Sequence, residues 1–153
     1  MPRVSNGWAI ARGTAALATI LFASALALGA DTPLGTWNTV DDKTGKVVSE
    51  VQLYEQGGKI YGKIVRLANP TDEKGKPKVC TKCRGADEDQ PLLGLVIVRD
   101  LSPEKDRFKG GTILDPSDGK VYKAEVWTEG SDTLKVRGYL GPFYKTQTWT
   151  KAK

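Results

Sequence analysis

Apolar and polar residues alternate along most of the chain beyond residue 31, as expected for strands that bury one face. Val51 and Leu53, for example, alternate with Glu50 and Gln52. No stretch of this part repeats its apolar positions with the period of a helix. The pattern predicts eight strands: Thr36–Val40, Val47–Tyr54, Lys59–Leu67, Leu92–Asp100, Arg107–Leu114, Val121–Thr128, Thr133–Leu140 and Lys145–Lys151.

Short turns separate most of these strands. Gly57-Gly58 and the segment from Asp115 to Lys120 are typical of hairpin connections, because glycine adopts the positive φ angle that they need. Successive hairpins predict an all-β fold, a small antiparallel up-and-down barrel of about eight strands, whose closure removes exposed edges. We expect a small cavity, since the inward candidates are bulky: Val51, Leu53, Ile64, Tyr122, Val126, Leu134 and Val136.

The first 30 residues form a distinct segment. Arg3 and Arg12 precede an almost wholly apolar run, residues 13–28, which ends in small residues at Ala27 and Ala30. This order predicts a signal peptide over residues 1–30 and a single barrel domain over residues 31–153. The alternative is a transmembrane anchor from Ala9 to Ala30, and Arg12 inside that stretch argues against it. We therefore expect a periplasmic or secreted protein with no stable membrane anchor after cleavage.

Composition and charge exclude several classes of function. The chain has 153 residues, of which 39% are hydrophobic and 27% charged, as in ordinary globular proteins. Removing Arg3 and Arg12 from the 23 basic residues leaves 21 against 18 acidic ones. These charges are interspersed, so nucleic-acid binding is not expected. Without any histidine, the commonest general base is missing, and we expect neither an enzyme nor a cofactor.

The segment from residue 68 to residue 91 is a long, highly charged loop, far longer than a hairpin connection. It holds the only two cysteines, Cys80 and Cys83. A disulfide is the first interpretation, because exported proteins meet an oxidising space. A metal site completed by Asp87 or Glu88 is the second, although zinc usually takes four N or S ligands.

A redox-active pair is the third interpretation of the two cysteines. Lys78, Lys82 and Arg84 would lower a thiol pKa, but the βαβ context of thioredoxin-like sites is missing. Of the three, we predict the disulfide. Lys82 and Arg84, with Phe143 and Tyr144 in the last connection, are candidate contacts for a partner. The alternative for the two aromatics is that they fold over the barrel end as a plug.

Gly35-Thr36-Trp37 at the start of the first strand resembles the Gly-x-Trp signature of the calycin group, which includes lipocalins, fatty-acid-binding proteins and avidins. The resemblance implies that Trp37 closes one end of the barrel and that a basic side chain from a late strand packs across it. Arg137 is the candidate for that side chain, although the alternation assigns it to the outer face. Burial statistics favour a structural role for Trp37 rather than a ligand contact.

An ordered set of motifs covers nearly all of the predicted domain. Together they resemble a large bacterial family of exported, lipocalin-like proteins that is catalogued only as a domain of unknown function. That family implies no activity and no catalytic residues, and the Cys80-x-x-Cys83 pair departs from its pattern. The motifs are Gly35-Thr36-Trp37, Gly62-Lys63-Ile64-Val65, Pro91-Leu92-Leu93-Gly94-Leu95, Gly110-Gly111-Thr112-Ile113-Leu114-Asp115-Pro116, Gly119-Lys120-Val121-Tyr122, Asp132-Thr133-Leu134-Lys135-Val136-Arg137-Gly138-Tyr139 and Thr146-Gln147-Thr148-Trp149-Thr150.

Two classes of function fit these observations. The first is a non-catalytic binding module that holds a small apolar ligand or engages an envelope protein. The second is a structural or interaction protein of the envelope with a solid barrel. It would act through the Cys80–Cys83 loop, by contact with a partner or by binding a metal. Extraction of the purified protein followed by mass spectrometry separates the two, because only the first predicts a co-purifying ligand.

Export is directly testable. We expect expression with intact secretion to give a mature protein whose first residue is near Asp31, because the leader carries the charge, apolar run and small residues that signal peptidase requires. N-terminal sequencing of the extracytoplasmic protein measures this. A stable exported protein that retains Arg12 and Gly13 would contradict the expectation.

Overall fold

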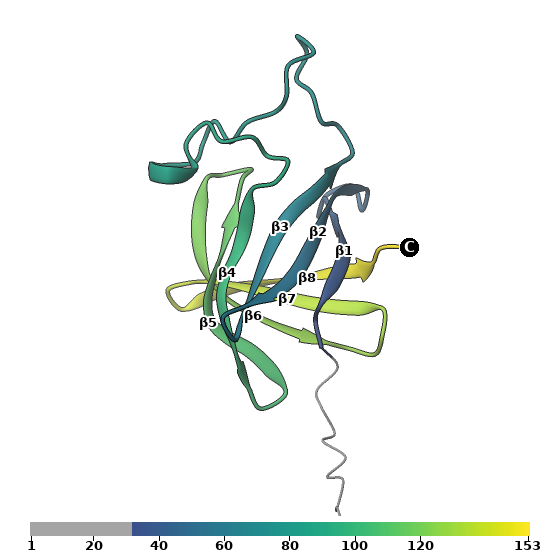
Figure 1. The fold of residues 1–153 in the computed structure, drawn as a ribbon, viewed down its shortest axis with the longest axis vertical. Helices are drawn as coiled ribbons and strands as arrows, with labels where there is room; N and C mark the ends of the chain where they lie inside the picture. The colour runs from purple at the N-terminus through teal and green to yellow at the C-terminus, as the bar shows by residue number, and fades with distance from the viewer. Residues whose placement is uncertain (1–31) are drawn as a thin grey trace, which may run out of the picture.

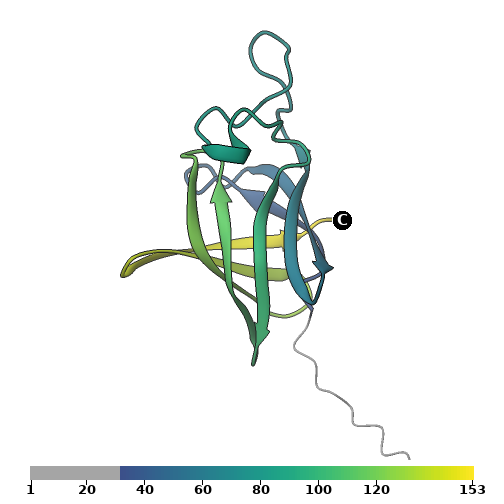
Figure 2. The ribbon, with the colours of Figure 1, turned by 60° about the vertical axis from the view of Figure 1, so that its left-hand side comes forward.

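The structure is a computed structural model that describes residues 32–153, so the predicted signal peptide lies outside the described residues. Eight strands form one closed antiparallel barrel in sequence order, as predicted (Figures 1 and 2). Within residues 32–153, no helix is long and apolar enough to cross a membrane. The elements are β1 (Gly35–Val40), β2 (Val47–Gln56), β3 (Lys59–Leu67), η1 (Gly85–Asp87), β4 (Val96–Glu104), β5 (Arg107–Asp115), β6 (Lys120–Thr128), β7 (Thr133–Leu140) and β8 (Phe143–Lys151).

The fourth strand lies four residues later than the pattern predicts. Leu92 donates its backbone N–H to Lys78 within the loop, and Gly94, at a φ of 89°, donates to Ile64. Regular pairing therefore starts at Val96, and the loop extends over residues 68–95. Asp100 at a φ of 59° interrupts the alternation, and the strand then continues to Glu104. The apolar run at residues 92–95 belongs to the loop.

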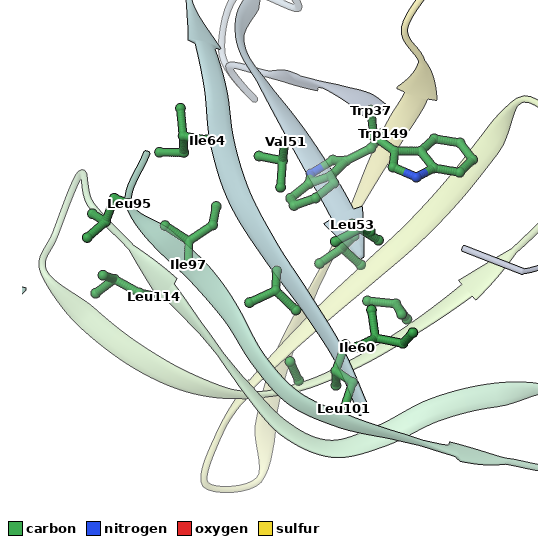
Figure 3. Close-up of a cluster of buried hydrophobic side chains, with 14 of the residues drawn as sticks. Trp37, Val51, Leu53, Ile60, Ile64, Leu95, Ile97, Leu101, Leu114 and Trp149 are labelled. Carbon is green, nitrogen blue, oxygen red and sulfur yellow. The ribbon is translucent and has the colours of Figure 1, made fainter. Parts of the chain in front are cut away.

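Buried side chains fill the lower part of the barrel, at the end opposite the long loop. Figure 3 shows four of them, which come from the three strands β1, β2 and β4 and are all at most 2% exposed: Trp37, Val51, Leu53 and Leu101. Gly62 is required in this layer, since a Cβ atom there would lie 2.6 Å from Leu53 Cδ2. The filled end gives the barrel its hydrophobic core.

Trp37 closes this end, but its basic partner is Lys151 rather than Arg137. The indole N–H donates to the carbonyl of Pro33 at 2.7 Å, and the Lys151 ammonium lies 4.5 Å from the ring centroid. Lys151 Nζ also donates to the Leu34 carbonyl at 3.1 Å. The pairing with Arg137 was wrong because β8, not β7, lies beside β1 in the closed barrel.

Arg137 stacks instead on the outer surface of the barrel. Its guanidinium lies 5.0 Å from the Trp127 ring centroid and 4.4 Å from that of Tyr144. Beneath it is Glu125 of β6, a charged residue that is nevertheless only 7% exposed. Glu125 is covered because Arg107 donates to its carboxylate at 2.6 Å, with Arg137 Nη1 at 3.7 Å. This buried carboxylate links three neighbouring strands.

We expect Trp37→Ala to lower the free energy of unfolding by about 3–5 kcal/mol, because it leaves a cavity in the filled end of the barrel. Trp127→Ala is the matched control. Its ring lies on the outer surface between two guanidiniums, and its loss should cost less. Urea unfolding followed by circular dichroism measures both changes. Equal losses would contradict the structural role given to Trp37.

Candidate functional site

The end of the barrel that bears the long loop is hollow. A cavity of about 870 Å³ opens there, among the residues where β1, β3, β5 and β7 end and β2, β4, β6 and β8 begin. The turn between β1 and β2, the long loop and the turn between β5 and β6 surround its mouth. The bulky inward residues therefore fill only part of the barrel, and the expectation of a small cavity was wrong.

Apolar side chains form the depth of the cavity and much of its wall. Trp149, which is 2% exposed, belongs to both the core and the cavity lining, and so joins the two. Tyr122 lines the cavity with its ring beside Gly138, where an added Cβ atom would lie 3.3 Å from Tyr122 Cβ. The other apolar lining residues include Ile64, Leu67, Leu92, Ile97, Ile113, Leu114 and Val136.

A line of polar groups follows β8 along one side of this cavity. Trp149 donates its indole N–H to Gln147 Oε1 at 3.2 Å, and Gln147 Nε2 donates to Asp42 Oδ2 at 3.3 Å. Lys145 donates to the same Asp42 oxygen, and this contact raises the pKa of Lys145. Three alternate residues of β8 thus present hydrogen-bonding groups from the depth of the cavity to its rim.

A second polar pair lies on β6 and the turn before it. The Tyr122 hydroxyl donates to the Asp118 carboxylate, which raises the pKa of Tyr122 to about 12 because ionisation would place two negative charges together. Partial burial acts to raise the pKa of Asp118, but the hydrogen bonds from Tyr122 and from the Lys120 backbone lower it overall. Near neutral pH, Tyr122 is therefore a hydrogen-bond donor and Asp118 a carboxylate.

The long loop, residues 68–95, which we also call the disulfide loop, packs against the rim of the cavity at the β5–β6 turn. Cys80 and Cys83 are joined by a disulfide and are 1% and 3% exposed, so the bridge itself is buried although its neighbours in the loop are exposed. Lys82 Nζ donates to the Ser117 carbonyl at 2.7 Å. Gly119 permits this approach, because a Cβ atom there would lie 1.9 Å from the Lys82 carbonyl oxygen. The loop is thereby fixed against the barrel.

The same loop has a second anchor at η1. Asp87 accepts two hydrogen bonds from the Arg99 guanidinium, at 2.9 and 2.8 Å. The metal interpretation required Asp87 or Glu88 to bind a metal ion together with the cysteines. Asp87 instead forms an ion pair with Arg99. Among residues 32–153, no group of three or more potential Cys, His, Asp or Glu ligands is placed to hold a metal ion.

The four predicted contact residues fall into two groups. Lys82 and Arg84 are exposed on the disulfide loop, although Lys82 is tied to the turn below it. Phe143 and Tyr144 lie at the start of β8 and line the cavity mouth, with exposed fractions of 76% and 61%. They do not fold over the barrel end as a plug.

Sequence reasoning missed Asp42, Lys145 and Gln147. The signal for the last two was present, because Thr146, Thr148 and Thr150 alternate with them and with the buried Trp149. That alternation places the side chains of Lys145 and Gln147 on the inner face with Trp149. Asp42 had no such signal, since its approach to β8 depends on barrel closure.

Comparisons with known proteins agree with this architecture. The family model described as "Uncharacterized protein conserved in bacteria (DUF2147)" matches residues 35–151. The solved structure of protein HP1028 from the human pathogen Helicobacter pylori, described as belonging to the lipocalin family, superposes with a TM-score of 0.65. It is 24% identical over 78% of this chain and 82% of its own, so the likeness concerns the fold alone. None of the curated proteins compared with the chain matches it.

We expect the double substitution Cys80→Ala and Cys83→Ala to make residues 68–95 more sensitive to trypsin, because the bridge no longer restrains the segment bearing Lys82 and Arg84. The closed ring is short, so barrel unfolding should shift by about 2 kcal/mol or less. Limited proteolysis with mass spectrometry measures the first effect, and Thr81→Ala inside the intact ring is the control.

The wild-type protein must also resist alkylation in the absence of reductant. Two freely alkylated thiols in the exported protein would contradict a disulfide between Cys80 and Cys83.

Proposed function

We propose that this chain, which belongs to the bacterial family DUF2147, is an exported binding protein for a small amphipathic molecule. The description of that family assigns no activity. The ligand would occupy the cavity at the open end of the barrel. One observation carries the proposal: a cavity with apolar depth has a line of hydrogen-bonding groups along one wall.

The size of the cavity supports a ligand of small-molecule dimensions. Small-molecule sites in proteins usually measure about 300–1,000 Å³, and the cavity of about 870 Å³ lies within that range. Its opposite end is filled by Trp37 and its neighbours, so the route to the cavity is the loop-bearing mouth. A ligand would enter with its apolar part toward Trp149.

The polar wall supports an amphipathic ligand over a wholly apolar one. Gln147 and Lys145 share Asp42 as acceptor, which leaves further donor N–H groups on both side chains available to a bound molecule. These donors lie on one side of the cavity, whereas aliphatic side chains such as Ile97 and Ile113 line it from strands that are not paired with β8. A ligand with an acceptor on one edge of an apolar body matches this distribution.

The chemistry of the mouth supports binding without catalysis. Asp41 accepts the backbone N–H groups of Lys43 and Thr44, and Asp115 accepts that of Ser117, so both act as turn-forming carboxylates. Hydrogen bonding to Thr44 lowers the pKa of Asp41. Tyr122, with its pKa raised to about 12, remains protonated and is a poor general base.

We expect the leader-free protein to bind the fluorescent apolar probe N-phenyl-1-naphthylamine, with quenching of Trp149 because this ring lines the cavity. Ser49→Phe should weaken binding at least about tenfold, since its ring would occupy space beside Thr39. Gln52→Phe is the matched control, on the outer side of the same strand β2.

Mass spectrometry of an organic extract of the exported protein complements the titration. A ligand that co-purifies with the wild type and with Gln52→Phe, but not with Ser49→Phe, supports the proposal. Equal probe affinity for the two phenylalanine variants, with both folded, would reject the cavity as the binding site.

A further inference from the structure

The connection between β7 and β8 carries the two most exposed large apolar side chains of the described residues, Phe143 and Tyr144, together with the exposed Leu140. Phe143, Tyr144 and Leu140 have exposed fractions of 76%, 61% and 55%. Leu140 and Phe143 are paired across the turn, and Tyr144 lies opposite Tyr139. We call residues 139–144 the hairpin tip. Figure 2 shows it projecting beyond the other strands of the barrel.

Basic side chains surround the base of this tip. Arg137 packs over the Tyr144 ring at 4.4 Å, Lys145 follows it in β8, and the exposed Lys123 lies opposite Tyr139 on the neighbouring strand β6. Two acidic groups of the described residues contact this set: Asp42 pairs with Lys145, and the Glu125 carboxylate lies 3.7 Å from Arg137 Nη1. The tip is therefore an apolar projection with a basic collar made of Lys123, Arg137 and Lys145.

We infer that the hairpin tip docks the protein reversibly on an anionic lipid surface. Apolar and aromatic side chains that project ahead of lysine and arginine are suited to the bilayer interface. There the rings lie at headgroup depth and the cations meet anionic lipids. Tyrosine is favoured at that depth because its ring is apolar and its hydroxyl polar.

The shape of the tip favours a lipid surface over a folded protein partner. Stable protein interfaces bury about 800 Å² on each side, which requires a broad patch rather than the end of a two-stranded hairpin. The deformable bilayer interface accommodates a narrow projection without a complementary pocket. The backbone of the tip is compatible with this environment, since Leu140 and Phe143 are paired within the hairpin and Pro142 has no N–H group.

The position of the tip links docking to the cavity. Leu140, Phe143 and Tyr144 all line the cavity mouth, so docking through them would turn the mouth toward the lipid. This link rests on the proposed binding function, whereas docking itself does not. A ligand could then pass between the bilayer and the cavity without crossing much water.

Vesicle flotation tests the inference with the leader-free form, whose residues 32–153 contain the complete closed barrel. We expect the protein to float with vesicles of phosphatidylethanolamine and phosphatidylglycerol. Pure phosphatidylcholine should bind several-fold less, and added salt should weaken binding to the anionic vesicles. Equal binding to both kinds of vesicle would overturn the inference that the tip docks on an anionic surface.

Matched variants locate the contact. Leu140→Ser and Phe143→Ser should each lower the partition onto anionic vesicles several-fold, and Lys123→Gln should lower it and reduce its salt dependence. Leu93→Ser is the control, because Leu93 has the same exposed fraction of 55% but lies in the disulfide loop. Circular dichroism must show all variants folded. Wild-type binding by Phe143→Ser would overturn the inference.

Two further outcomes distinguish alternative occupants. Concentration-dependent self-association that Phe143→Ser abolishes, without vesicle binding, would replace the lipid with a second copy of the chain. Loss of vesicle binding in Ser49→Phe but not in Phe143→Ser would assign the lipid to the cavity. That result would overturn docking while leaving the proposed function intact. Failure of probe binding with vesicle binding retained would reject the proposed function alone.

Discussion

Closure between β1 and β8 is the constraint on which the rest of the structure depends. These strands pair through only two residue pairs, Trp37 with Lys151 and Asn38 with Thr150, whereas β7 and β8 share eight. Trp37 packs beneath Lys151, whose ammonium group contacts both the indole ring and the Leu34 carbonyl. This short seam removes the two free edges that an eight-stranded meander would otherwise expose.

The shortness of the seam also explains why the barrel is filled at one end and hollow at the other. Beyond Asn38 and Thr150, no further residue pair of the described chain joins the two strands. Asp42, in the turn that follows β1, instead reaches β8 by side-chain contacts with Lys145 and Gln147. Side-chain bridges leave room that backbone pairing would close, so the cavity and its polar wall arise where the ladder stops.

The long loop and the hairpin tip give this open end two different kinds of rim. The loop is held by its disulfide, by Lys82 on Ser117 and by Asp87 on Arg99, so its contacts are internal to the protein. The tip has most of its apolar surface uncovered. A fixed rim beside an exposed projection suits a preformed cavity that is presented to another surface, with little rearrangement on binding.

The sequence by itself determined the strands, their order and the cysteine pair, because alternation, turn residues and proximity along the chain are local signals. The resemblance of Gly35-Thr36-Trp37 to the calycin signature implied that Trp37 closes one end. Only the tertiary structure decided that Lys151 rather than Arg137 covers Trp37, that Glu125 is buried, and that the cavity exists. These features depend on which strands become neighbours when the barrel closes, and on where the β1–β8 ladder ends. The late start of β4 also depends on contacts that the alternation does not show, since Leu92 donates to Lys78 within the loop and Leu95 donates back to Leu92.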